Sequence, residues 1–277
     1  MSRFLVTNET GGAIPLELNR FPDGQIQVKV KLENIKGTRF TIKASVSDSI
    51  GLDILRQTHN LFSARGVVGV QIMYAYGARC DKYDAGDYAV ANVAAEFSEL
   101  LYAMREDVAV VLAPHSVACL YAGCPTNNDL RTLFPDIIEI HDLIVFPDQS
   151  AFSRYNHCLV KGQKFVVLEK ERDQETGKII GLKVAGELPQ TTGQTLIVDD
   201  ICDGGRTFEQ AAQLLKKEGL QGGINLLIVH GIFSGNALAA LEAAGIGGIW
   251  CTNSYRDCRD IAVTYQEVWG GLTPQEF

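Results

Sequence analysis

The residues best suited to carry chemistry lie in one stretch, residues 195–208, which reads TLIVDDICDGGRTF. Its apolar run ends in paired carboxylates, and an acidic, glycine-bearing turn then leads into a helical pattern. Backbone N–H groups of such a turn bind phosphate at a helix N-terminus, and paired aspartates accept hydrogen bonds from vicinal hydroxyls. A phosphate beside a diol indicates a ribose phosphate. The residues expected at this site are Asp199, Asp200, Asp203, Gly204, Gly205, Arg206 and Thr207.

The same stretch also fits a strand, turn and helix without a ligand. In that reading Asp203 only caps the helix that follows, as aspartate often does. The local pattern leaves both readings open.

Further polar side chains follow apolar runs at several points along the chain. Open α/β sheets place their ligand crevices at the carboxyl ends of their strands, so the fold alone could gather these side chains. Strand ends are also polar simply because loops face water, and this reading applies to any single position. The positions concerned are His115, Asp148, Lys170, Asp199, Asp200, His230 and Asn253.

The elements that must position these residues alternate between helical periods and short apolar strands. Residues 50–62 and 90–104 keep one apolar face at helical spacing, and residues 67–74 and 108–114 form β-branched runs. Several later runs are apolar throughout, as expected for a parallel sheet covered by helices on both faces. Residues 21–45 and 168–186 instead predict antiparallel ribbons, the second turning at Thr176-Gly177. The expected fold class is α/β, with two doubly wound parallel-sheet domains and hairpin additions.

Composition and charge bound the class of protein. The 277 residues include 25 Lys+Arg and 33 Asp+Glu, a net charge of −8, which argues against a general nucleic-acid binder. No apolar run is long enough to cross a membrane and no signal peptide is recognisable, so a cytoplasmic protein without membrane partners is expected. The seven cysteines show no CxxC or Cys/His ligand spacing and are read as reduced, mostly buried thiols. We expect two domains, 1–133 and 134–277.

Several motifs occur in the order found in one family, the ribose-phosphate pyrophosphokinases, or PRPP synthetases. The stretch at residues 195–208 resembles the ribose-phosphate loop of that family. The matching motifs follow the same order along the chain, from residue 21 to residue 254. The other motifs are FPDGQ at 21–25, YAYGARCDK at 74–82, APHS around His115, FPDQSAFSR at 146–154, LEKER at 168–172, HGIFSG at 230–235 and TNS at 252–254.

The resemblance implies a type I phosphoribosyltransferase fold and transfer of the β,γ-diphosphate of ATP to the anomeric hydroxyl of ribose 5-phosphate, giving PRPP and AMP. Lys170 and Arg172 would neutralise the charge that develops in transfer. Asp199 and Asp200 would orient the ribose hydroxyls, and residues 203–207 would hold the phosphate.

For the nucleotide, the resemblance implies that Phe21 stacks on adenine and that Asp23 and Gln25 contact its edge. His115 and Asp148 would ligate the Mg²⁺ that bridges the ATP phosphates, and His115 is also counted among the ATP contacts. Arg79 is expected to reach the ATP of a neighbouring subunit, which implies at least a homodimer. The remaining expected ATP contacts are Asp81 and Arg154.

The phosphate loop departs from the family pattern. It reads D-G-G-R-T where PRPP synthetases usually read D-T-[AC]-G-T. Two glycines leave more room, and Arg206 adds a guanidinium that can bind further phosphate oxygens. A larger acceptor, ADP-ribose, therefore stays open; a similar branch of phage proteins makes ADP-ribose pyrophosphate for rebuilding NAD from nicotinamide.

Two other classes also stay open. A phosphoribosyltransferase would share the loop but would not need the 21–25 hairpin, His115 or the Lys170/Arg172 pair. A non-catalytic paralogue of a synthetase would be favoured by loss of Lys170 or of the paired aspartates, and all of these are present.

Overall fold

The computed structural model describes residues 1–277 except 76, 78–83, 86–87, 90–91, 117–121 and 173–178. The chain divides into two compact units, Met1–Asn127 with Glu267–Phe277, and Asn128–Gln266. The first part of the first unit ends at Asn127. The division into domains 1–133 and 134–277 stays a proposal, and it differs from these units in two respects. Residues 128–133 group with the second unit, and the last eleven residues group with the first.

The first unit is built on a six-stranded sheet with the order β17-β1-β4-β5-β8-β9. The strands from β4 to β9 are parallel, whereas β1 is antiparallel to both β4 and β17. The sheet strands are β1 (Arg3–Asn8), β4 (Arg39–Ser45), β5 (Val67–Tyr74), β8 (Val108–Leu112), β9 (Thr126–Asn127) and β17 (Gln275–Glu276).

Helix α1 (Ser49–Ser63) begins where Asp48 caps it by accepting a hydrogen bond from Gly51 N at 2.7 Å. Its apolar face packs on β4 and β5, and its buried residues include Ile54, Leu55 and Phe62. Helix α2 (Val93–Ala103) is capped in the same way by Asn92. The apolar periodicity predicted both helices, since one face of each is buried in the core of the unit.

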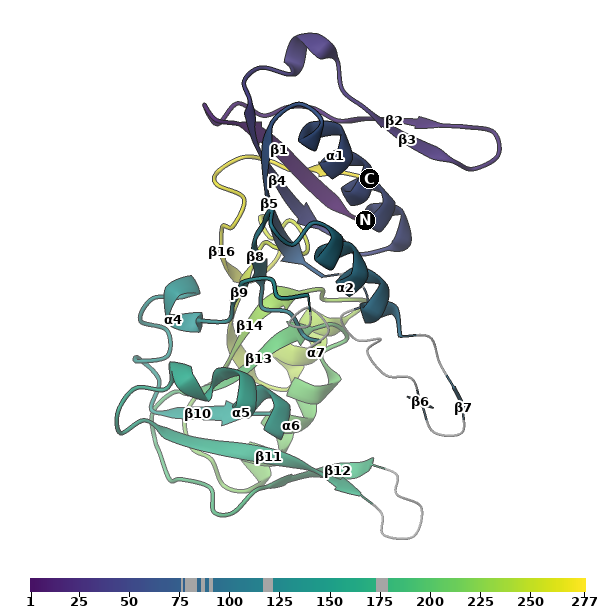
Figure 1. Ribbon diagram of the computed structural model, residues 1–277. Coiled ribbons are helices and arrows are strands. Elements are labelled where there is room, and N and C mark those ends of the chain that lie inside the picture. The colour runs from purple at the N-terminus through teal and green to yellow at the C-terminus, as the bar shows by residue number, and fades with distance from the viewer. Residues whose placement is uncertain (76, 78–83, 86–87, 90–91, 117–121, 173–178) are drawn as a thin grey trace. The chain divides into compact units, whose positions relative to one another are not determined.

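Smaller elements complete the first unit. The ribbon of β2 (Glu17–Arg20) and β3 (Ile26–Lys29) is an antiparallel hairpin (Figure 1), and Gln57 of α1 fastens it by bonding Val28 N and Ile26 O. The other elements are the 3₁₀ turn η1 (Leu32–Asn34) and the short strands β6 (Asp84–Ala85) and β7 (Tyr88–Ala89).

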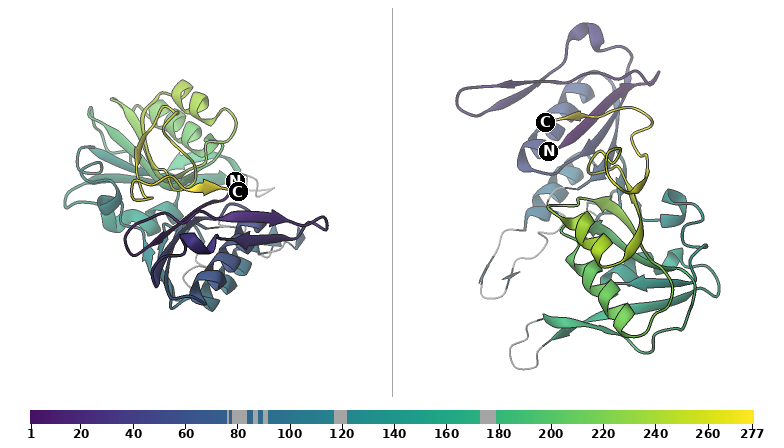
Figure 2. Two further views of the ribbon diagram at one scale, coloured as in Figure 1. Left: turned by 90° about the horizontal axis from the view of Figure 1, so that it is seen from above. Right: turned by 180° about the vertical axis from the view of Figure 1, so that it is seen from behind.

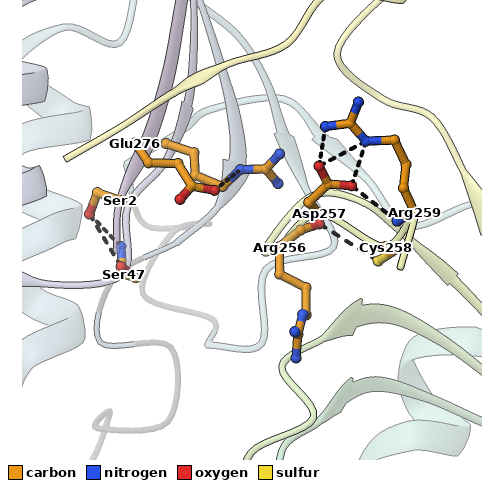
Figure 3. A network of polar contacts seen from close by, with 8 residues as sticks. Ser2, Ser47, Arg256, Asp257, Cys258, Arg259 and Glu276 are labelled. Carbon is orange, nitrogen blue, oxygen red and sulfur yellow. Dashed lines mark hydrogen bonds and ion pairs between the residues drawn. The ribbon is translucent and has the colours of Figure 1, made fainter. Parts of the chain in front are cut away.

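The C-terminal segment completes the first sheet. Strand β17 pairs with β1, and the two chain ends lie close together (Figures 1 and 2). Trp269 is 1% exposed and packs with Leu5 and Met73, while the Arg3 guanidinium lies 5.1 Å from the centroid of its ring. Arg3 also pairs with Glu276 across the β1–β17 junction at 3.6 Å (Figure 3).

The second unit is a seven-stranded sheet with the order β12-β11-β10-β13-β14-β15-β16. Every neighbouring pair is parallel except β11 and β12, which form the predicted ribbon; its expected turn, Thr176-Gly177, lies outside the described residues. The strands are β10 (Leu143–Phe146), β11 (Lys164–Arg172), β12 (Ile179–Val184), β13 (Thr195–Cys202), β14 (Ile224–Gly231), β15 (Ile246–Thr252) and β16 (Thr264–Gln266).

The helices of the second unit are short except for α6. They are α4 (Leu130–Leu133), α5 (Gln149–Tyr155), the 3₁₀ turn η2 (Asn156–Cys158), α6 (Arg206–Lys217) and α7 (Ala237–Ala243). Parallel strands and helices in both units confirm the α/β fold class. Among the described residues, no helix is long and apolar enough to cross a membrane.

Candidate functional site

The strand order of the second unit reverses between β10 and β13. From β10 the chain proceeds to β11 on one side, and from β13 it proceeds to β14 on the other. Ligands of open parallel sheets bind at the carboxyl ends of the strands beside such a reversal. The carboxyl end of β10 leads to Asp148, and that of β13 carries Asp199 and Asp200. The fold thus brings Asp148 to the same edge as the adjacent pair Asp199 and Asp200, which lies about fifty residues later in the sequence.

Arg154 joins this edge through an ion pair. Helix α5 begins directly after Asp148, which caps it by accepting from Ala151 N at 3.0 Å, and Arg154 lies in its last turn. The Arg154 Nη1 atom lies 2.8 Å from Asp200 Oδ2 and 4.0 Å from Asp199 Oδ1. The Asp200 side chain is 1% exposed and that of Arg154 is 15% exposed, so this pair is largely withdrawn from water. Arg154 supplies the positive charge that two adjacent buried carboxylates require.

The protonation of the aspartate pair follows from its surroundings. Burial raises the pKa of Asp199 well above its ordinary value, and the negative charges of Asp200 and Asp148 raise it further. The three carboxylates therefore repel one another through a poorly solvated region. A cation or a set of hydroxyl donors placed there would relieve this repulsion, as a metal ion or a sugar diol does.

A turn at the N-terminus of α6 forms the second part of the site. Gly205 is the N-cap residue, with φ at 79° and no side-chain cap. The N-cap position is thus taken by Gly205 and not by Asp203. The Asp203 carboxylate accepts from Ser234 Oγ instead, and Asp203 O accepts from Ser234 N at 3.1 Å. The helix N-terminus is left to backbone N–H groups, as an anion-binding turn requires.

The two glycines of this turn have different surroundings. A Cβ at Gly205 would lie 3.3 Å from Leu241 Cγ, and its positive φ disfavours any side chain. A Cβ at Gly204 would meet nothing within 4 Å. Gly204 is exposed, as are the neighbouring Arg206 and Thr207. The turn is therefore packed on the Gly205 side and open on the Gly204 side.

Residues behind the turn are apolar or already hydrogen-bonded. Burial, followed by the charges of Asp203 and Asp199, raises the pKa of Cys202 to about 12, so this thiol stays neutral at physiological pH. His230 is 2% exposed, and its Nδ1 lies 2.8 Å from Ser254 Oγ. His230 thus belongs to the packed strand rather than to a loop.

The remaining predicted residues of the second unit lie on β11. Lys170 pairs with Leu182 and Arg172 with Ile179 in the antiparallel ladder, with a register shift between Glu171 and Arg172. Both positions therefore lie at the carboxyl end of β11, the strand next to β10. Their catalytic roles stay predictions.

The nucleotide-contact residues predicted in the first unit fall at two places. Phe21, Asp23 and Gln25 form the turn of the β2–β3 hairpin, where Asp23 Oδ1 accepts from Gln25 N at 3.1 Å and Phe21 is 43% exposed. His115 follows β8 and is half-buried. The other two, Arg79 and Asp81, lie outside the described residues. All these nucleotide contacts stay predictions.

Sequence reasoning missed two neighbours of the site. Tyr155 is 1% exposed, and its pKa is raised well above the ordinary value by burial and then by Asp200. Ser234 fixes Asp203 from the segment after β14, within HGIFSG. The HGIFSG match could have indicated Ser234. For Tyr155 the sequence offered only its position next to Arg154.

A solved structure shares the fold of this chain. The structure of phosphoribosylpyrophosphate synthetase from Mycobacterium smegmatis is similar over 93% of this chain and 87% of its own, with a TM-score of 0.69 and 17% sequence identity. The chain therefore shares the α/β fold of that structure. A family model described as "Phosphoribosyl synthetase-associated domain" matches residues 175–263, which include the paired aspartates and the turn.

Curated proteins of similar sequence share one name. Ribose-phosphate pyrophosphokinase from Aquifex aeolicus is 25% identical over 264 residues, which cover 90% of this chain and 83% of the relative. The enzyme of the same name from Methanosarcina mazei is 24% identical over 245 residues, which cover 86% and 80%. The chain therefore resembles the ribose-phosphate pyrophosphokinases over most of its length, and this likeness indicates an enzyme of the diphosphotransferase class.

Proposed function

We propose that the protein is a Mg²⁺-dependent pyrophosphokinase that transfers the β,γ-diphosphate of ATP to the anomeric hydroxyl of ribose 5-phosphate, giving PRPP and AMP. The observation that carries this proposal is the pairing of Asp199 and Asp200 with an uncapped helix N-terminus on the same strand-turn-helix segment. Carboxylates accept hydrogen bonds from the sugar hydroxyls, and the turn at residues 203–207 binds the 5-phosphate.

The residues divide the work of transfer as follows. Attack of the anomeric oxygen on the β-phosphorus breaks its bond to the α–β bridging oxygen, which leaves with AMP. Lys170 and Arg172 neutralise the charge that accumulates during this exchange. Arg154 holds an ATP phosphate; because it already donates to Asp200, it does so through the other N–H groups of its guanidinium. Phe21, on the exposed hairpin turn, stacks on the adenine.

The donor set of the second unit fits Mg²⁺. Asp148 lies near enough to Asp199 for its charge to raise the Asp199 pKa, so hard oxygen ligands converge at the carboxyl ends of β10 and β13. Asp148 would be a ligand of the ion, and His115 stays a predicted ligand. When bound, Mg²⁺ would neutralise the charge of the ATP phosphates.

A second candidate acceptor is ADP-ribose, which would give ADP-ribose pyrophosphate for rebuilding NAD from nicotinamide. The observation that favours it is the open side of the turn, where a Cβ added at Gly204 would meet nothing within 4 Å and Arg206 is exposed. A 5′-phosphate that is esterified needs this space, and the Arg206 guanidinium is suited to its additional phosphate. We also propose a homodimer or larger assembly, in which Arg79 contacts the ATP of a neighbouring subunit.

The test is AMP release from Mg-ATP, with ribose 5-phosphate and ADP-ribose as separate acceptors and product masses recorded. AMP with PRPP supports the first proposal, and AMP with pyrophosphorylated ADP-ribose supports the second. AMP from neither acceptor contradicts both, and would favour a phosphoribosyltransferase or a non-catalytic paralogue. Arg206→Thr is the matched variant, because it should weaken the binding of ADP-ribose more than the binding of ribose 5-phosphate.

A further inference from the structure

Three side chains with metal-binding atoms meet at the beginning of the second unit. Asp129, His157 and Cys158 place one carboxylate oxygen, one imidazole nitrogen and one sulfur within 4.8 Å of one another. The sequence showed no familiar Cys/His ligand spacing, because Asp129 lies far along the chain from the adjacent His157 and Cys158. We propose that these three residues bind a Zn²⁺ ion that fastens the start of the second unit to the end of α5.

The distances within the cluster suit tetrahedral zinc. Cys158 Sγ lies 3.4 Å from His157 Nε2 and 3.8 Å from Asp129 Oδ1. Bonds of about 2.3 Å to sulfur and about 2.0–2.2 Å to nitrogen and oxygen separate tetrahedral ligand atoms by about 3.3–3.6 Å. Both separations are therefore within a few tenths of an ångström of those in a loaded site. Small rotations of these side chains would complete the geometry.

Neighbouring groups already orient the carboxylate. Asp129 Oδ1 accepts from Arg131 N at 3.0 Å and from Arg131 Nε at 3.3 Å, and Oδ2 accepts from Thr132 Oγ1 at 3.2 Å. Metal-binding carboxylates are commonly held by such outer hydrogen bonds. Asn128 supplies further oxygens, because its carbonyl lies 3.8 Å from Cys158 Sγ and its side-chain Oδ1 is buried without a hydrogen-bond partner among the described residues.

The donor types select the metal. A thiolate and an imidazole favour Zn²⁺ over Mg²⁺, so this site differs from the oxygen-rich edge at Asp148. Cys158 would release its thiol proton to solvent on binding, and the thiolate and the Asp129 carboxylate would then balance the two charges of the ion. His157 is exposed and Cys158 is buried, so solvent reaches the cluster from the imidazole side.

The position of the cluster suggests a structural purpose. Asp129 is the N-cap of α4 and the second residue of the second unit, whereas His157 and Cys158 form the 3₁₀ turn that continues α5. A metal there would close a loop of roughly 30 residues and restrict the helix whose last turn carries Arg154. The site would bind zinc whether or not the chain transfers diphosphate.

The experiment titrates the metal-free full chain with Co²⁺ as a spectroscopic substitute, followed by displacement with Zn²⁺. A thiolate-to-cobalt charge-transfer band that saturates at one equivalent is expected. Cys158→Ser should abolish the band, and His157→Ala and Asp129→Asn should each weaken binding by about tenfold or more. Cys124→Ser is the matched control, because the Cys124 thiol is also buried but contacts only carbonyl oxygens among the described residues.

The test does not depend on whether Cys158→Ser folds. His157 is exposed, and asparagine caps helices as well as aspartate does, so His157→Ala and Asp129→Asn should fold even if Cys158→Ser does not. The absence of a thiolate band in the unsubstituted chain would overturn the proposal. Unchanged Co²⁺ affinity in both His157→Ala and Asp129→Asn would overturn it as well.

Discussion

Replacing Arg154 tests whether the aspartate pair depends on one buried cation. Arg154→Met keeps much of the apolar stem but leaves Asp200, which is 1% exposed, without the guanidinium 2.8 Å away. Removing one partner of a buried ion pair costs about 3–5 kcal/mol. Because Arg154 is 15% exposed and one carboxylate of the pair can take up a proton, we expect a loss near the lower end, about 3 kcal/mol of the free energy of unfolding.

The pH dependence of this loss has a defined sign. Without Arg154 the folded-state pKa of the aspartate pair rises further above that of the unfolded chain. The folded variant then binds more protons than the unfolded variant, so its stability falls as the pH rises through the folded pKa. The deficit relative to the unsubstituted chain should therefore be larger near pH 8 than near pH 5.

Urea unfolding followed by Trp250 fluorescence measures the effect, in a Trp269→Phe background. The chain has two tryptophans, and Trp250 belongs to the second unit whereas Trp269 belongs to the first. Lys183→Met is the control, because Lys183 and Glu169 form an exposed pair whose loss should cost at most about 1 kcal/mol. A loss for Arg154→Met as small as the control, at both pH values, would refute the reasoning.

Four further predictions each rest on one or two substitutions. Gly205→Ala should cost about 1–2 kcal/mol of stability and weaken ribose 5-phosphate binding, because φ at Gly205 is 79°. Gly204→Ala should leave stability unchanged, because a Cβ there would meet nothing within 4 Å. Equal losses of stability for the two variants in calorimetry would contradict the packing of the turn. Burial lowers the pKa of His141 below 6.5, so stability should be lost as the pH falls below that value, and His141→Gln should remove this slope in urea titrations. Tyr155→Phe should leave the free energy of unfolding unchanged or raise it by up to about 1 kcal/mol, because the buried Tyr155 hydroxyl has no hydrogen-bond partner among the described residues. A loss of more than about 1 kcal/mol would show that the hydroxyl has a partner. Lys170→Ala should raise the activation barrier by about 3–4 kcal/mol with little change in ATP binding, and near-normal turnover would remove it from the mechanism.

Local patterns were sufficient to predict the elements that bury their own apolar residues. The run at 67–74 is β5 over the same residues, and the periodic segment at 50–62 is α1 with one more residue at each end. The position of Asp148 and the aspartate pair at strand ends was also predictable, because parallel strands end at one edge. These features depend on short-range sequence and on one rule of topology.

Pairings between distant segments could not be read in the same way. Nothing in the sequence near Trp269 indicates that β17 pairs with β1, since two residues of strand carry little pattern. The ion pair between Arg154 and Asp200 depends on the direction in which α5 leaves β10, and the cluster at Asp129 depends on where η2 ends. Each needs long-range packing, which single-sequence patterns do not encode.

The short contacts of the loop after β15 are a different case. Asp257 accepts from Arg259 N and Nε at 3.0 Å, and the Cys258 thiol lies 3.6 Å from Arg256 O (Figure 3). Residues this close in sequence could have been paired by turn chemistry, because aspartate commonly bonds the backbone two residues ahead. These contacts are therefore local, although the loop carries no match to the family motifs beyond residue 254.

Diphosphate transfer itself is tested most directly by labelled ATP. The unsubstituted protein is incubated with Mg²⁺, ribose 5-phosphate or ADP-ribose, and ATP that carries the label either at the α-phosphate or at the β-phosphate. The account predicts that α-label ends in AMP and that β-label ends in the phosphorylated sugar product. β-Label that remains with the adenine nucleotide, or that appears only as free phosphate or diphosphate, would contradict it.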